Sequence, residues 1–265
     1  MDFLHFKLYA ALIILGLTIV AAIIPFRKRF TSQIATEFPI GEALAAGVFL
    51  GAGLIHLLGE SASNMAVPVA AHGDHLHGEA HPYPWPFVIC GLSFLFLLFL
   101  EHVGTEIRHK NHANPHKQAI ITLLTIAILC LHSLFAGAAL GIVQNFSSVL
   151  ILFFAILAHK WAESFALAVQ INKSSLGVRA RIGYFVLFTL MTPLGIFIGE
   201  NIPFLTSQAG HFEMVFTSLA AGTFLYIGTL HGLINAPMIK RCCNLKEFLF
   251  VVLGFVLMAV VGIWT

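Results

Sequence analysis

The residues with the clearest potential for chemistry are two histidines and a glutamate that stand inside long apolar stretches. His159 and Glu163 are spaced i, i+4, which on a helix places an imidazole nitrogen and a carboxylate about one turn apart on one face. His132 stands in the preceding apolar stretch. Two imidazoles and a carboxylate suit Zn²⁺ and, with less discrimination, Fe²⁺, Mn²⁺, Co²⁺ or Cd²⁺. The pattern predicts a site for a divalent transition metal, with water or Ser133 completing the ligand shell.

The composition indicates what surrounds these polar groups. Of the 265 residues, 58% are hydrophobic and 10% are charged, whereas soluble domains have roughly 25% charged residues. Stretches close to the ~20 apolar residues that cross a bilayer recur along the chain. We expect helices at 8–25, 41–60, 85–101, 118–141, 148–171, 182–200, 212–234 and 247–264. The sequence therefore predicts an all-α integral membrane protein with eight transmembrane helices in a single membrane domain, 1–265.

The basic residues indicate how the chain is oriented. They cluster after the first, third, fifth and seventh expected helices, and the other connections contain none. Under the positive-inside rule, the basic connections are cytoplasmic and both termini lie outside. We expect a multi-pass protein of the cell membrane that contacts the lipid bilayer and no nucleic acid. The basic residues in the connections expected to be cytoplasmic are Arg27, Lys28, Arg29, Arg108, Lys110, Lys117, Lys173, Arg179, Arg181, Lys240, Arg241 and Lys246.

This topology places the candidate ligands near the middle of the membrane. At 1.5 Å per residue, His132 lies about 21 Å and His159 about 18 Å from the cytoplasmic ends of their helices. Gly137 and Gly141 have the small-xxx-small spacing that lets a membrane helix approach its neighbour closely. A charged group at the centre of a membrane helix costs at least ~2.5 kcal/mol, which favours a functional role. The alternative is structural: hydrogen bonds between helices, with Lys160 and Glu163 forming an ion pair.

Two polar loops are rich in histidine. The 61–84 loop, expected outside, and the 102–117 loop, expected in the cytoplasm, hold imidazoles spaced closely enough to chelate a metal weakly. We predict that they capture metal; the alternative is that they are ordinary solvated loops. The predicted ligands are His72, Asp74, His75, His77 and His81 outside, and His109, His112 and His116 inside.

Other polar residues are expected to have simpler roles. Glu101 and Glu200 stand at helix ends, where contact with solvent is the simplest expectation. Cys242 and Cys243 are expected to be reduced thiols beside a helix end, although such a pair can also bind metal or carry an acyl chain. The sequence contains no glycine-rich phosphate loop, so coupling to ATP within this chain is not expected.

Four segments together carry a family resemblance. HSLFAGAALG at 132–141 and HKWAES at 159–164 resemble the paired signature segments of the ZIP (Zrt/Irt-like protein) metal transporters. GVFLGAGLIHLLGES at 47–61 resembles the second helix of that family, and AGTFLYIGTLH at 221–231 resembles its seventh. The segments occur in the family's order, and the likeness spans essentially the whole chain.

The resemblance implies a function and a set of roles. It implies a single transport domain that imports a divalent metal, Zn²⁺ first, into the cytoplasm, with the metal as substrate and no prosthetic group. It also implies an elevator-like arrangement of two bundles, in which helices 8–25, 118–141, 148–171 and 182–200 move past the rest. The transport-site positions are His132, Ser133, His159 and Glu163, and the positions along the route or its gates are His56, Glu60 and His231.

The chain departs from the dinuclear members of that family at three positions. Those members have an acidic residue, an acidic or amide residue, and an acidic residue where this chain has Ala136, Lys160 and Thr192. The substitutions remove most ligands of a second metal, and the Lys160 ammonium can stand as a surrogate for the second cation. We therefore predict one transported metal per site.

An intramembrane zinc-dependent hydrolase is the alternative function. Such an enzyme needs a fixed Zn²⁺, an open coordination position for water and a general base. No HExxH segment is present in this chain. We expect that the protein is not an enzyme.

The Gly- and Ala-rich helix faces are compatible with a homodimer.

Overall fold

The computed structural model describes residues 3–31, 38–66, 83–110, 117–201, 209–233 and 245–264, and among these only helices and short connections occur. The all-α prediction is confirmed. In chain order the elements are α1 (Phe3–Thr31), α2 (Pro39–Gly51), η1 (Ala52–Leu57), α3 (Leu58–Ala66), α4 (Trp85–Lys110), α5 (Lys117–Ile142), α6 (Phe146–Lys173), α7 (Val178–Asn201), α9 (Ala209–Tyr226), η3 (Ile227–Leu233) and α11 (Leu245–Val261). The π-helical segments η1 and η3 continue α2 and α9 directly, so the described residues form eight helical rods.

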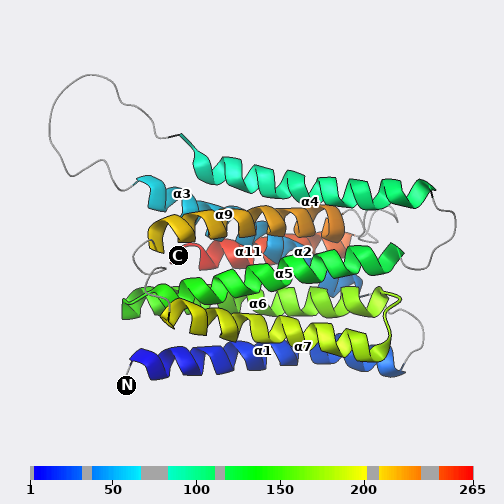
Figure 1. Ribbon diagram of the computed structural model, residues 1–265, viewed down its shortest axis with the longest axis horizontal. Helices are drawn as coiled ribbons and strands as arrows, with labels where there is room; N and C mark the ends of the chain where they lie inside the picture. The colour runs from blue at the N-terminus through cyan, green and yellow to red at the C-terminus, as the bar shows by residue number, and fades with distance from the viewer. Residues whose placement is uncertain are drawn as a thin grey trace.

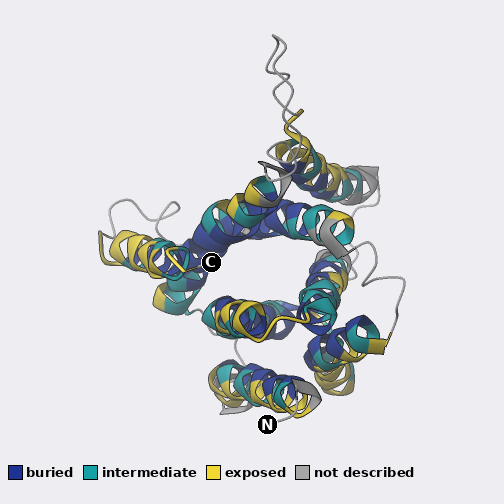
Figure 2. Cartoon of the chain, turned by 90° about the vertical axis from the view of Figure 1, so that its left-hand side faces the viewer, coloured by how far each residue is buried: buried dark blue, intermediate teal, exposed yellow. Residues whose placement is uncertain are grey.

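Six of these rods are long and apolar enough to cross a membrane: His5–Arg27, Pro39–Ser63, Trp85–Val103, Thr122–Ile142, Phe146–Lys173 and Val178–Asn201. The rods lie side by side, and α1 begins on the same side of the bundle as α11 ends (Figure 1). We call this the termini side. Large apolar side chains such as Leu12, Val20 and Phe197 are exposed. Exposed residues lie mainly on the outward faces of the rods (Figure 2). A surface of this kind is typical of helices that face lipid.

Four glycines join α5 to α7 at very short range. A Cβ at Gly137 or Gly141 would overlap the carbonyl oxygen of Thr192 or Ile196, and a Cβ at Gly195 or Gly199 would overlap a carbonyl oxygen of α5. The prediction that the glycines of α5 permit a close approach to a neighbouring helix is correct, and that neighbour is α7. Glycine spacing indicates that a helix can approach a neighbour and does not indicate which one.

Polar side chains fasten α1 to this group. Ser164 and Asn172 of α6 donate hydrogen bonds to the backbone carbonyls of Thr18 (2.5 Å) and Pro25 (3.0 Å) on α1. Lys7 is buried; it donates to the Gly141 carbonyl over 2.6 Å and forms an ion pair with Glu200. Glu200 is therefore a partner of α1, and the expectation that it is simply solvated is wrong. Helices α1, α5, α6 and α7 form one group, which we call the site group.

The remaining rods form a second group around a repeated sequence pattern. Leu44–Leu50 in α2 and Leu219–Leu225 in α9 share the pattern LAAGxFL, and each is followed by a π-helical segment that contains GxxH. Phe49 and Phe224, at the same place in the pattern, pack edge to face with ring centroids 5.0 Å apart.

The contacts of the glycines repeat as well. A Cβ at Gly53 would lie 3.3 Å from the Ala221 carbonyl oxygen, and one at Gly228 would lie 3.2 Å from the Ala46 carbonyl oxygen. Gly47 of α2 packs on α11 as Gly222 of α9 packs on α4. Helices α2, α4, α9 and α11 thus form a second group, which we call the frame group, with α2 and α9 in matching positions.

One contact within the frame group corrects another expectation. The Tyr226 hydroxyl of α9 donates a 2.7 Å hydrogen bond to a carboxylate oxygen of Glu101 on α4. Glu101 is therefore engaged by a neighbouring helix and is not simply solvated.

Candidate metal site

Helices α5 and α6 bring His132, His159 and Glu163 together. One ligand atom of each residue lies within 4.8 Å of the other two, and all three side chains are buried. Glu163 Oε1 is 3.3 Å from His132 Nε2 and 3.4 Å from His159 Nε2. The i, i+4 spacing on α6 and the contact with α5 therefore produce the arrangement that the sequence predicts for these three residues.

The imidazoles lack the hydrogen bonds that buried polar groups normally make. Among the described residues, none of the four ring nitrogens of His132 and His159 has a hydrogen-bond partner of good geometry. Leaving a buried polar atom without a partner costs roughly 1–3 kcal/mol. Two such rings facing one carboxylate form a set of donor atoms that a divalent metal can bind.

The second oxygen of Glu163 has different partners. Glu163 Oε2 accepts from Lys160 Nζ over 2.9 Å and from Ser133 Oγ over 3.2 Å. Lys160 Nζ also donates to Ser133 Oγ over 2.6 Å and lies 4.4 Å from the centre of the Phe188 ring. Lys160 is 1% exposed. The carboxylate therefore has one oxygen toward the imidazoles and the other toward a buried ammonium.

Phe224 is a site residue that sequence reasoning missed. Its ring lies against both imidazoles, with centroids 4.2 Å from the His132 ring and 5.4 Å from the His159 ring. The signal for it was the repeated LAAGxFL pattern, which places Phe224 and Phe49 at matching positions.

A cavity of about 90 Å³ reaches the two histidines and is also lined by His56 and Glu60. The His56 ring is 6.0 Å from the His159 ring, centroid to centroid, and His56 Nδ1 lies 3.7 Å from Glu60 Oε2. Apart from Thr217, the other described residues of the lining are apolar, and they include Ile142 at the end of α5, on the termini side. The cavity thus connects the candidate site with that side of the bundle.

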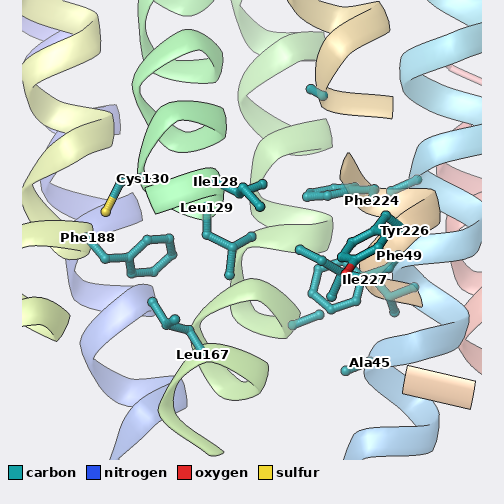
Figure 3. Close-up of a cluster of buried hydrophobic side chains, with 14 of the residues drawn as sticks. Ala45, Phe49, Ile128, Leu129, Cys130, Leu167, Phe188, Phe224, Tyr226 and Ile227 are labelled. Atoms are coloured by element: carbon teal, nitrogen blue, oxygen red, sulfur yellow. The ribbon is translucent and has the colours of Figure 1, made fainter. Parts of the chain in front are cut away.

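Apolar side chains lie on the opposite side of the candidate site. Leu129 and Leu167, about one turn beyond His132 and Glu163, belong to the same buried cluster as Phe49, Phe224 and Ile227 (Figure 3). Some of these side chains line a separate cavity of about 60 Å³, whose polar lining includes Glu42, Thr125 and Gln170. This packed layer lies between the histidines and that second cavity.

For the other residues singled out in the sequence, the structure describes the surroundings of some and not of others. Ala136 lines the cavity that reaches the histidines, and the hydroxyl of Thr192 is buried without a hydrogen-bond partner among the described residues. His231 lies in η3 and His109 in α4, but their side chains are outside the described part. The residues that lie wholly outside the described ranges are His72, Asp74, His75, His77, His81, His112, His116, Cys242 and Cys243.

Comparison with known proteins identifies the family. A family profile described as ZIP Zinc transporter matches residues 4–119 and 105–262. Zinc transporter ZIP2 of Homo sapiens is 26% identical over 83% of this chain and 84% of its own length. Zinc transporter 11 of Arabidopsis thaliana is 25% identical over 97% of this chain and 85% of its own, and Zinc transporter ZIP1 of Danio rerio is 31% identical over 76% and 60%.

These relatives are named as transporters, which supports the expectation that the chain is not an enzyme and leaves the hydrolase alternative without support. The resemblance that rested on four sequence segments is confirmed over nearly the full length of the chain. The chain belongs to the ZIP zinc transporter family.

Proposed function

We propose that this protein imports a divalent transition metal, Zn²⁺ first, across the cell membrane into the cytoplasm through one site formed by His132, His159 and Glu163. The observation that carries the proposal is the buried pair of imidazoles, which face one carboxylate oxygen and have no hydrogen-bond partner among the described residues. The names of the relatives support zinc as the substrate.

The site holds one metal because a side chain supplies the second positive charge. Lys160 occupies the side of Glu163 that faces away from the imidazoles, and Ser133 bridges the two by accepting from one and donating to the other. The charges of Lys160 and Glu163 cancel, so the metal binds a site of zero net charge. A neutral site holds a divalent ion less tightly than an anionic one, which favours release on the far side.

The route begins on the termini side, which we place outside the cell, in line with the positive-inside rule. All eight rods then cross the membrane, α9 with η3 and α11 included. The histidines and Asp74 of the 61–84 loop capture metal, and His56 with Glu60 passes it to His159. On the cytoplasmic side, His231, His109, His112 and His116 receive it. The apolar layer that contains Leu129 and Leu167 closes this side in the conformation described.

Release requires the site group to move past the frame group. The glycine contacts between α5 and α7 and the polar contacts between α1 and α6 hold the site group together. The frame group is held by the corresponding contacts of α2 with α11 and of α9 with α4. An elevator-like movement of one rigid group against the other preserves both sets of contacts and exposes the site to each side in turn.

The test is metal uptake by liposomes that contain the purified chain and a Zn²⁺-sensitive dye. Saturable uptake that His159→Ala and Glu163→Ala abolish supports the proposal. His5→Ala, which removes an exposed histidine of α1, is the matched control and retains uptake. Uptake that survives both site substitutions in folded protein means that the route lies elsewhere. Tight Zn²⁺ binding without uptake of Zn²⁺, Fe²⁺, Mn²⁺, Co²⁺ or Cd²⁺ contradicts transport.

A further inference from the structure

A groove of about 530 Å³ runs along the surface between α1 and α7, far larger than the cavity of about 90 Å³ at the histidines. Its walls are apolar, with Leu15, Ile19 and Ile23 on α1 and Ile182, Val186 and Leu190 on α7. Among the described lining residues, Thr189 alone carries a hydroxyl, which donates to the Phe185 carbonyl within its own helix over 2.8 Å. The groove therefore offers an occupant apolar surface along almost its whole length.

One end of the groove is different. Among the described residues that line the groove, Arg27 is the only charged one. Beside it, Phe26 and Phe185 pack edge to face with centroids 5.2 Å apart, which joins the two helices at this end. Arg27 lies near the end of α1, on the side opposite the termini side. A long apolar channel that ends at a guanidinium matches a molecule with a hydrocarbon chain and an anionic head.

The length of the groove fits one leaflet of a bilayer. From Leu15 to Arg27 the helix rises by about 18 Å, compared with about 15 Å for half of the hydrocarbon core. An acyl chain lying along the groove therefore begins near the middle of the membrane and reaches the headgroup level at Arg27.

We propose that this groove binds one anionic phospholipid of the cytoplasmic leaflet, with an acyl chain between α1 and α7 and the phosphate at Arg27. The proposal rests on the orientation given under the proposed function and not on the metal site. Both helices belong to the site group. The lipid fills the space that their side chains leave and is expected to travel with them.

The test is native mass spectrometry of the full chain in detergent with increasing phosphatidylglycerol or phosphatidylcholine. We expect one retained phosphatidylglycerol and weaker retention of phosphatidylcholine. Arg27→Gln should weaken retention of phosphatidylglycerol about fivefold, and Arg27→Lys should largely preserve it. Ile19→Trp fills the groove and should abolish retention.

The matched control is Val20→Trp, at the same depth on α1 but outside the groove lining, where the native side chain is 61% exposed; it should leave retention unchanged. Because Arg27→Gln changes none of the apolar residues that line the groove, it keeps the test decisive when the tryptophan variant does not fold. Equal retention of both lipids, or retention unaffected by Arg27→Gln and Ile19→Trp, overturns the proposal. Metal uptake measured separately on the same variants distinguishes this result from failure of the transport proposal.

Discussion

Lys173 of α6 donates a 2.6 Å hydrogen bond to Glu42 of α2, and this ion pair joins the site group to the frame group. Glu42 also lines the cavity beyond the apolar layer, on the side that we place in the cytoplasm. If the two groups move past each other as proposed, this ion pair stabilises only the conformations in which it forms. In the structure described the pair is formed, and the side that we place in the cytoplasm is closed by the apolar layer.

Breaking this pair should therefore open the cytoplasmic side more often. We expect Glu42→Gln to raise the reactivity of Thr125→Cys, at the second cavity, toward a membrane-impermeant thiol reagent by up to about fivefold, because part-exposed ion pairs contribute roughly 0.2–1 kcal/mol. The measurement uses a background without Cys242 and Cys243. The exchanged pair Glu42→Lys with Lys173→Glu should restore the original reactivity. Reactivity that is the same in all three proteins would mean that the pair does not control access.

The pair formed by Lys160 and Glu163 should show strong coupling in stability. Glu163→Gln or Lys160→Met alone leaves a buried charge without its partner, which costs about 3–5 kcal/mol. The double variant removes both charges and should be more stable than the sum of the single effects implies. Thermal unfolding in detergent checks this. Additive effects on the free energy of unfolding would show that the two charges do not depend on each other. The double variant should still fail to transport metal, because it lacks the Glu163 ligand.

The stoichiometry of metal binding should follow the charge at position 160. We expect one tightly bound Zn²⁺ per chain in a background whose 61–84 histidines are replaced by serine. Lys160→Asp combined with Ala136→Glu removes the fixed cation and adds two carboxylates, which should create a second site. Lys160→Met is the control and should bind one metal. Metal analysis of protein dialysed at buffered free Zn²⁺ gives the count. Two intramembrane metals in the unaltered site would contradict the single-metal proposal.

The contact between α5 and α7 should tolerate no added atoms. Gly195→Ala places a Cβ against the Leu134 carbonyl oxygen, and overpacking of this kind typically costs about 1–3 kcal/mol. Gly183→Ala, on the same helix but with no atom within 4 Å of its Cβ, is the control and should not lower stability. The comparison requires thermal unfolding and metal uptake of both variants. Equal stability would show that the helices can separate without loss.

The sequence predicts the parts of this molecule that follow from local periodicity. The i, i+4 spacing of His159 and Glu163 and the depth of His132 were sufficient to predict their convergence, because a helix fixes both face and height. Pairings between distant helices do not follow from such patterns. A lone Lys7 near the start of the chain gives no sign that it will be buried against Glu200, and the spacing of Gly137 and Gly141 does not identify α7 as their partner.

The matching segments of α2 and α9 run in opposite directions (Figure 1), so their two GxxH segments lie toward opposite sides of the bundle. Whatever asymmetry the carrier has must come from positions where the two halves differ. Glu60, four residues after His56, is one of them, because its counterpart four residues after His231 is Asn235. The two segments thus share a backbone pattern and a histidine, and they differ in the polar residue that follows the histidine.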